Sequence, residues 1–208
     1  MKAELCTPTL GRPREFDVEQ ALAAALKVFW RKGFDGASMT DLTEAMGVTK
    51  PSLYCAFGNK EQLFKKALDL YEREKLAFMD QALTAPTAYE VAERLLTGCC
   101  TIYADPETPG CMGVNSVLAH GGVASEAVRE ELLGRKLSFE TKILRRFERA
   151  KAEGDLSDDC DPQSLTLFIQ TLANGIAVQA SSGVKREALN MVVKAALAGW
   201  PRRRQTVA

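Results

Sequence analysis

Histidine, paired cysteines and net charge are all scarce in this sequence, and each shortage narrows the classes of protein that it can encode. The 208 residues include one histidine, His120, and six cysteines that form no CxxC pair. Tetrahedral zinc sites need clustered Cys and His ligands, so neither a metal nor another cofactor is expected. The 27 basic and 27 acidic residues cancel. Any nucleic-acid contact must therefore come from a local patch and not from an overall positive field.

Long apolar runs and catalytic loops are missing as well. No segment approaches the roughly 18 apolar residues of a membrane span, and the N-terminal segment lacks the apolar run of a signal peptide. We therefore expect a cytoplasmic protein with reduced thiols and no membrane partner. The sequence contains neither a Gly-rich phosphate loop nor a GxSxG motif, which argues against an enzyme.

Helical periodicity runs through most of the chain, and no run of alternating β-branched residues interrupts it. The sequence predicts an all-α fold. Preferred capping residues open the first four helices, at Asp17, Ser38, Thr49 and Asn59. Gly33 and Gly47 are expected to end the first two. The fourth helix is expected to run unbroken through Phe78 and to connect two domains.

Later helices are expected at residues 89–103, 125–153, about 165–180 and 189–196. A Pro/Gly loop is expected at 105–110, followed by a short helical segment that ends at Gly121.

Three short helices in the first sixty or so residues, the second and third separated by Gly47 and Val48, are typical of a helix-turn-helix. The residues add more specific information. The segment GRPREF, followed by AALKVFWRKGFDGASMTDLTEAMGVTKPSLYCAFGNKEQLF, closely resembles the DNA-binding domain of the tetracycline-repressor (TetR) family. The resemblance covers about residues 11–71.

The resemblance implies a three-helix DNA-binding domain, a larger helical domain, and repression that an inducer relieves. It implies the following organisation: an arm at 1–16, a helix-turn-helix domain at 17–62, an effector-binding and dimerisation domain at 63–200, and a basic tail at 201–208. The implied partners are double-stranded operator DNA, a second copy of the chain and a small-molecule or electrophile inducer. A DNA-binding module without an effector is an alternative, and an enzyme is a more distant one.

Carried over by position, the family's recognition helix falls on residues 49–57. Its DNA-facing set comprises Thr49, Lys50, Pro51, Ser52 and Tyr54, while Thr40 and Lys60 fall on backbone-contacting positions. Lys50 can reach guanine acceptors, and short polar side chains suit phosphates. Two interpretations of Tyr54 remain open, a phosphate contact and packing on the helix edge. Cys55 and Ala56 replace the polar residues that are frequent in the family.

Arg12 and Arg14 precede the first helix. Two interpretations of these arginines fit equally well: an arm that contacts the minor groove or a phosphate, and a solvated charged tail.

The helix expected at about 165–180 carries closely spaced small residues, Ala173, Gly175, Ala177 and Ala180, which allow close helix packing. The resemblance assigns dimerisation to the last two helices, and ordinary core packing is the alternative. Effector-site candidates are Tyr103, Met112, Asn115, His120, Phe139, Phe168 and Asn174, of the kinds that a mostly apolar site uses. Each of them is also an ordinary core or helix-end residue type, and His120 can simply favour a helix C-terminus.

Cys111 follows Pro109 and Gly110, where a helix is expected to begin, and backbone N–H groups there favour a thiolate. Cys99 and Cys100 on the preceding helix are candidate partners for a disulfide. The hypothesis is a thiol switch at Cys111, and the alternative is a small buried apolar side chain.

Overall fold

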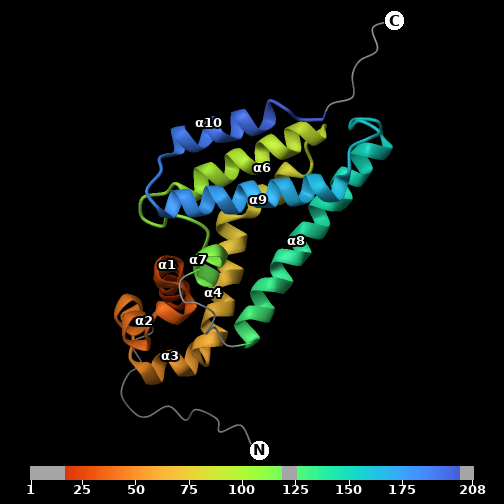
Figure 1. The fold of residues 1–208 in the computed structure, drawn as a ribbon. Helices are drawn as coiled ribbons and strands as arrows, with labels where there is room; N and C mark the ends of the chain where they lie inside the picture. The colour runs from red at the N-terminus through yellow and green to blue at the C-terminus, as the bar shows by residue number, and fades with distance from the viewer. Residues whose placement is uncertain (1–16, 119–125, 202–208) are drawn as a thin grey trace, which may run out of the picture.

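The computed structural model describes residues 17–118 and 126–201. These residues form ten α-helices and contain no strand, which confirms the predicted all-α class (Figure 1). Within these parts of the chain, no helix combines the length and apolar character needed to cross a bilayer.

The first three helices begin at the predicted capping residues. Helix α1 (Val18–Gly36) starts at Asp17, whose carboxylate accepts hydrogen bonds from the backbone N–H groups of Glu19 and Gln20. Gly33 has φ 67° and interrupts the helical geometry, so the predicted end at this glycine is confirmed and one more turn follows it.

Helices α2 (Met39–Met46) and α3 (Lys50–Phe57) are each two turns long. Ser38 and Asp41 form a reciprocal capping box at the start of α2, and Gly47 ends it in the left-handed conformation. Thr49 caps α3, with Pro51 in the first turn as expected.

The predicted connecting helix is shorter than the sequence indicates. Helix α4 (Lys60–Lys75) starts at the Asn59–Gln62 capping box, but it ends at Leu76, where φ is −103° and ψ is 1°. A separate helix, α5 (Ala77–Ala82), follows directly. The expectation of one unbroken helix through Phe78 is therefore wrong. Apolar spacing continues across the break because Leu76 and Phe78 pack against the C-terminal core, so periodicity alone conceals it.

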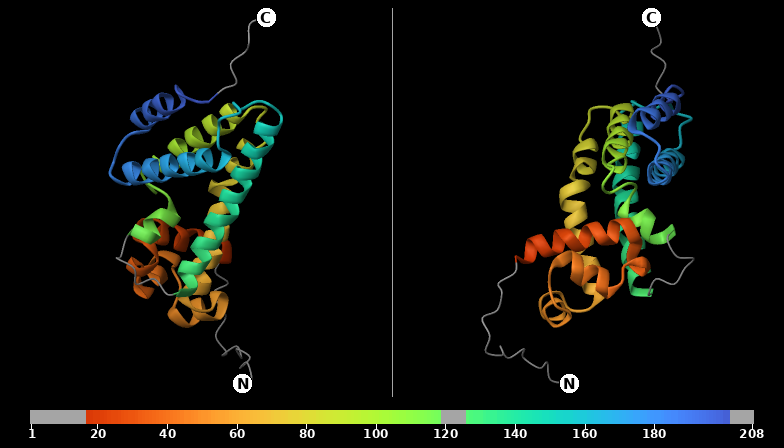
Figure 2. Two further views of the ribbon diagram at one scale, coloured as in Figure 1. Left: turned by 45° about the vertical axis from the view of Figure 1, so that its right-hand side comes forward. Right: turned by 90° about the vertical axis from the view of Figure 1, so that its left-hand side faces the viewer.

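The C-terminal part consists of α6 (Ala88–Tyr103), α7 (Met112–Leu118), α8 (Glu126–Ala152), α9 (Pro162–Ser181) and α10 (Arg186–Leu197). Helix α6 packs against α9 and α10, and α8 packs against α9. Figure 2 shows α1–α3 at one end of the molecule and α9 and α10 at the other.

Two hydrophobic cores hold these parts together. The N-terminal core is rich in aromatic rings: Trp30 packs edge-on against Tyr71, with ring centroids 4.6 Å apart, and Phe29 does the same against Phe64. Two buried side chains from later in the chain, Met112 of α7 and Val128 of α8, complete this core.

Polar contacts also join α1 to the C-terminal part. The indole Nε1 of Trp30 donates a buried hydrogen bond of 2.9 Å to the Gly110 carbonyl. The Asn115 amide donates to the carbonyls of Trp30 (3.0 Å) and Pro109 (3.1 Å), and its oxygen accepts from the Ser181 hydroxyl (3.0 Å). Gly110 has φ 82°, and an added Cβ would lie 2.0 Å from Ser181 Oγ. The loop before α7 is thereby fixed between α1 and α9.

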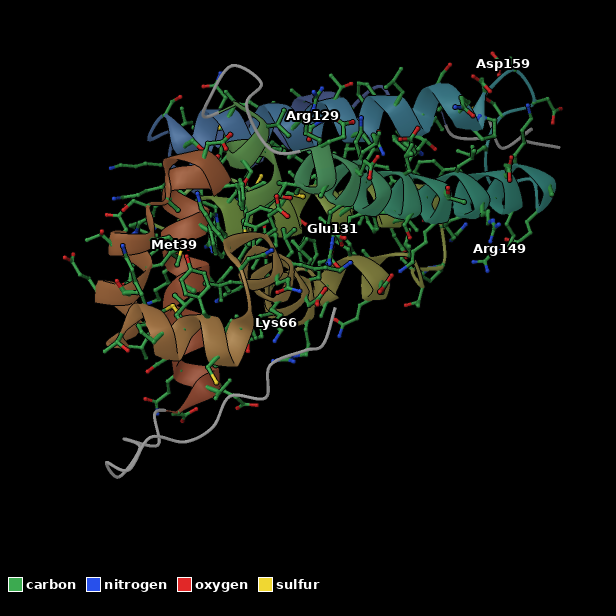
Figure 3. All side chains as sticks on the ribbon, turned by 90° about the horizontal axis from the view of Figure 1, so that it is seen from below. Met39, Lys66, Arg129, Glu131, Arg149 and Asp159 are labelled. Atoms are coloured by element: carbon green, nitrogen blue, oxygen red, sulfur yellow. The ribbon has the colours of Figure 1, made fainter. Side chains whose placement is uncertain are left out.

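Ion pairs connect α4 to the N-terminal half of α8. The Arg135 guanidinium binds Asp69 at 2.6 Å and Glu72 at 2.9 Å, and the Lys65 ammonium binds Glu131 at 2.8 Å. Figure 3 shows Glu131 between α8 and α4, whereas Arg149, near the other end of α8, points outward. We refer to the contacts of Lys65, Asp69, Glu72, Glu131 and Arg135 as the α4–α8 ion-pair cluster.

Candidate functional site

Helix α3 is held against the N-terminal core by one side only. Leu53 and Phe57 are buried, while Lys50, Pro51, Tyr54 and Cys55 are exposed. Tyr54 retains 50% of its exposure, so the structure favours a ring available to a partner over one packed on the helix edge. Helix α3 therefore presents a positive charge, a hydroxyl and a thiol to solvent.

The start of α3 offers short polar groups. The hydroxyls of Thr49 and Ser52 lie 2.9 Å apart, and the Thr49 hydroxyl also accepts a hydrogen bond of 3.4 Å from the Ser52 backbone N–H. Thr40, at the start of α2, is exposed. Backbone N–H groups and hydroxyls at a helix start suit the oxygens of a phosphate.

Lys60 is positioned differently from a solvated surface lysine. Its ammonium lies 4.4 Å from the centroid of the Phe34 ring, a cation–π contact. Partial burial lowers the pKa of Lys60, and the nearby Asp35 carboxylate acts in the opposite direction. The predicted phosphate-contacting residue is thus held at the base of α4, beside the short link that joins α3 to α4.

Two lysines that sequence reasoning missed support the same region. The Lys66 ammonium donates to the Ala56 carbonyl at 3.4 Å, near the end of α3, and lies 5.5 Å from the Phe57 ring centroid. Lys32 of α1 pairs with Asp41 of α2 at 2.7 Å. The Lys32 ammonium and the Ser38 donors lower the pKa of Asp41 to about 2. The sequence does not indicate that Lys66 contacts α3, because this contact depends on the packing of α4 on α3.

Three predicted residues, Arg12, Arg14 and His120, lie outside the described residues.

Cys111 lies directly before α7 and is half buried, and its sulfur accepts a hydrogen bond of 3.6 Å from the Tyr71 hydroxyl. Cys99 and Cys100 are fully buried on α6, and burial raises the pKa of Cys99 to about 12 and that of Cys100 to about 11. Burial, together with the nearby Cys111 and Cys99 sulfurs, raises the pKa of the Tyr103 hydroxyl, so these three side chains are neighbours.

The effector-site candidates from the sequence fall in several places. Tyr103 and Met112 are buried in core positions, and Asn115 makes the structural hydrogen bonds described above. Phe139 is half buried on α8 beside the C-terminal core. Phe168 and Asn174, in contrast, are exposed on α9.

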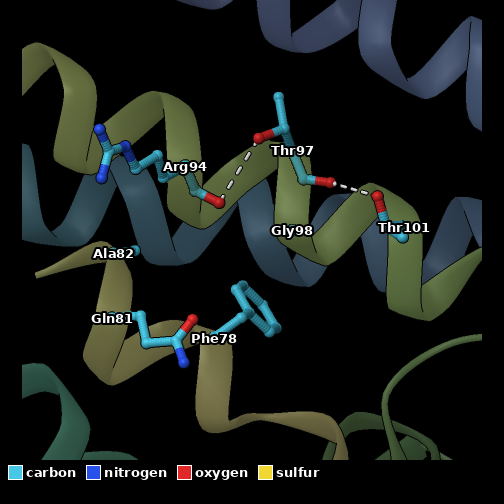
Figure 4. A pocket seen from close by; sticks show the side chains of 7 residues that line it. All are labelled: Phe78, Gln81, Ala82, Arg94, Thr97, Gly98 and Thr101. Atoms are coloured by element: carbon cyan, nitrogen blue, oxygen red, sulfur yellow. Dashed lines mark hydrogen bonds between the residues drawn. The ribbon is translucent and has the colours of Figure 1, made fainter. Parts of the chain in front are cut away.

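A cavity of about 330 Å³ lies between α5 and α6, away from these candidates (Figure 4). Its lining residues are Phe78, Gln81, Ala82, Arg94, Thr97, Gly98 and Thr101. The sequence carried one signal for it, a glycine in the middle of a predicted helix at position 98, which is usually retained for close packing.

Comparisons with known proteins agree with this arrangement. Residues 21–67 match the family described as bacterial regulatory proteins, tetR family. The chain is 29% identical over 195 residues to the transcriptional repressor ComR of Escherichia coli, covering 92% of each protein. It is 30% identical over 164 residues to the uncharacterized regulator YezE of Bacillus subtilis, covering 77% of this chain and 84% of YezE.

Among solved structures, the fold is similar to that of a cysteine mutant of the TetR family transcriptional regulator CifR in complex with a 26-base-pair double-strand operator DNA. The TM-score is 0.84 at 41% identity, with 92% of this chain and 100% of the other covered. The family match lies on α1–α4, and the relatives extend over both cores. The chain belongs to the TetR family of bacterial transcriptional regulators.

Proposed function

We propose that the protein is a transcriptional repressor that binds operator DNA as a homodimer. The observation that carries the proposal is helix α3, which is anchored by Leu53 and Phe57 and leaves Lys50 and Tyr54 exposed at the end of the molecule. The named repressor ComR and the operator complex of CifR support the same role. Such a protein works in the cytoplasm, where the chromosome is, and carries out no chemical turnover.

The DNA contacts divide into two kinds. Lys50 is the residue assigned to a base edge, because its long side chain is exposed at the start of the recognition helix and can reach guanine acceptors in a major groove. Thr40, Thr49, Ser52 and Tyr54 are assigned to phosphates, together with Lys60 if its ammonium leaves the Phe34 ring. Pro51, exposed in the first turn of α3, belongs to the same DNA-facing set.

The second copy is expected on α9 and α10. Large apolar side chains are exposed on these two helices: Leu167, Phe168, Val178, Met191 and Val192. A surface of this kind is unfavourable in water and favours burial against a partner. Pairing about a two-fold axis would place the two recognition helices in successive major grooves, about 34–36 Å apart.

Release from DNA is proposed to follow occupation or modification of the C-terminal part. A thiol switch at Cys111 is one candidate, because Cys111 adjoins Gly110, whose carbonyl binds the α1 indole. Diamide would take two electrons and two protons from Cys111 and a partner thiol, Cys99 or Cys100, as the disulfide forms. Burial raises the pKa of Cys99 to about 12 and that of Cys100 to about 11, which disfavours either as the attacking thiolate. If diamide weakens operator binding equally in wild type and Cys111→Ser, the switch is excluded.

Selection of DNA fragments from a random duplex pool tests the main proposal. A repressor of this kind should select a pseudo-palindrome and bind it as a dimer. Lys50→Ala should relax the preference at one base position. Lys60→Ala should weaken binding to every duplex and should reduce the dependence of affinity on salt concentration by the amount expected for about one phosphate contact. Lys136→Ala, an exposed lysine on α8, is the control and should change neither. Binding that shows no sequence preference, or a preference unaffected by Lys50→Ala, contradicts the assignment.

A further inference from the structure

The cavity between α5 and α6 has an apolar floor. The ring of Phe78 points toward α6 at Gly98, and the buried Ala82 lies one turn further along α5 (Figure 4). A Cβ added at Gly98 would lie 2.1 Å from Cε2 of Phe78. Glycine inside a helix lowers stability by about 0.5–1 kcal/mol relative to alanine. The chain thus carries a destabilising residue at the point where the ring needs room.

The rim of the cavity is polar and contains one cation. Arg94 is 55% exposed, and its nearest carboxylate oxygen, Glu90 Oε2, is 3.8 Å away, which is too long for a hydrogen bond. That oxygen is buried and accepts no hydrogen bond. The guanidinium therefore keeps donors for another acceptor. Gln81 adds an amide, and the hydroxyls of Thr97 and Thr101 donate to carbonyls of their own helix, which leaves oxygen lone pairs at the rim.

A guanidinium beside an apolar floor matches one class of small molecule. Arginine binds carboxylates through two parallel hydrogen bonds, and hydrocarbon groups pack on aromatic rings and methyl groups. The volume of about 330 Å³ is at the small end of ligand sites. Gln81, Arg94 and Thr101 are exposed, so a molecule can enter from solvent. An uncharged apolar molecule would leave the Arg94 donors and the Gln81 amide unused.

We propose that the α5–α6 cavity is the effector site of this repressor and that it binds small organic acids, with the carboxylate at Arg94 and the hydrocarbon part over Phe78 and Ala82. The proposal rests on the repressor function proposed above and names the class of its effector. Glu90 competes with the ligand's carboxylate for Arg94 and thereby weakens the binding of the acid.

The contacts around α5 explain how DNA binding would respond. Arg146 of α8 donates to the carbonyls of Leu83 (3.2 Å), Ala85 (2.8 Å) and Pro86 (3.0 Å) just after α5, and Lys142 pairs with Asp80 at 2.7 Å. Helix α8 therefore restrains α5 at its C-terminal end. A ligand that separates α5 from α6 would move the N-terminal end of α5, at the Leu76 break where α4 ends.

Helix α4 follows α3 after only Gly58 and Asn59, so a displacement at Leu76 reaches the recognition helix through one rigid element. A ligand shifts such an equilibrium only by its difference in affinity between the two arrangements. Organic acids are therefore expected to bind the isolated protein more tightly than the operator complex.

Titration calorimetry of the full chain with benzoate, hexanoate and the neutral isostere benzamide tests the site. The acids should bind saturably, and benzamide should bind at least about tenfold more weakly because it cannot form the ion pair. Arg94→Gln should weaken the acids by a similar factor. Glu90→Gln should act in the opposite direction and tighten them, since it removes the competing carboxylate.

Arg149→Gln is the matched control. Arg149 is 58% exposed and forms an i,i+4 pair with Glu153 at 3.7 Å, almost the same setting as Arg94 and Glu90, but it lies on α8 and does not line the cavity. The substitution should leave acid binding unchanged. All three substitutions lie on exposed or half-exposed side chains, so the variants are expected to fold, and thermal unfolding of each checks this.

Operator titrations with and without benzoate or hexanoate complete the experiment. The proposal is supported if the acids lower operator affinity in wild type and Arg149→Gln but not in Arg94→Gln. It is overturned if no acid binds with a Kd below about 1 mM, if Arg94→Gln binds acids as wild type does, or if bound acid leaves operator affinity unchanged. Failure to bind any duplex would contradict the repressor function instead, and calorimetry would still decide the site.

Discussion

Replacing Arg135 with glutamine tests whether the α4–α8 ion-pair cluster holds α4 in its DNA-binding position. The Arg135 side chain is 18% exposed and binds two carboxylates of α4, Asp69 and Glu72, as well as Glu131 on its own helix at 2.7 Å. Burial alone would lower the pKa of Arg135, but hydrogen bonds to Asp69, Glu131 and Glu72 outweigh it and raise the pKa above the ordinary arginine value.

The expected magnitude follows from the geometry. An exposed ion pair contributes about 0.2–1 kcal/mol and an i,i+4 pair on a helix about 0.3–0.5 kcal/mol. Two pairs between helices and one within α8 therefore sum to about 0.7–2.5 kcal/mol of unfolding free energy. If all of this free energy serves to hold α4 in its DNA-binding position, operator affinity falls by about 3–70-fold. A loss is expected because α4 follows α3 after only Gly58 and Asn59, so a shift of α4 also shifts α3.

Urea unfolding and fluorescence anisotropy with a labelled operator duplex measure the two quantities. The unfolding difference between wild type and Arg135→Gln should shrink in 1 M salt, where the screening length is about 3 Å. Arg149→Gln is the control, since its pair with Glu153 lies within α8 and both side chains are 58% exposed. If Arg135→Gln and Arg149→Gln give the same unfolding free energy and the same operator affinity, the cluster does not position α4.

Three further predictions concern the N-terminal core and its connections. Gly47→Ala should lower the unfolding free energy by about 1–2 kcal/mol, because φ is +65° with nothing within 4 Å, and Gly47→Asn should lower it less; urea unfolding of both variants checks this. Ionised Asp41 has a lowered pKa, so its stabilisation is complete above about pH 4 and lost as the pH falls toward 2; Asp41→Asn should show a shallower loss of stability between pH 5 and pH 2 than wild type. Asn115→Ala should lower the unfolding free energy by about 1–3 kcal/mol, because two backbone carbonyls lose their donor; an unchanged urea midpoint would contradict this.

The sequence predicts the N-terminal helices well because their boundaries are determined locally. A helix start depends on a side chain and a backbone N–H two or three residues apart, as at Ser38 and Asn59, so both partners are visible in one short segment. Gly33 and Gly47 act through their own backbone angles. The recognition helix and its exposed Lys50 follow from these boundaries.

What the sequence could not predict depends on contacts between distant segments. The break at Leu76 lies where α5 turns onto α6, and no glycine or proline in the sequence marks it. The cavity needs Phe78 and Arg94 on opposite sides, and their proximity is a property of the tertiary fold. The cation–π contact of Lys60 with Phe34 likewise joins helices that the sequence places apart.

The two side chains that complete the N-terminal core, Met112 and Val128, have a consequence for protein engineering. An exchange of the DNA-binding domain between regulators would treat residues up to α4 as a separable unit. In this chain a graft cut after Tyr71 would leave behind a fully buried methionine and a buried valine, and the host would have to supply groups of the same size from its own α7 and α8. Hybrids should therefore fold best when the residues at positions 112 and 128 are transferred together with the DNA-binding domain.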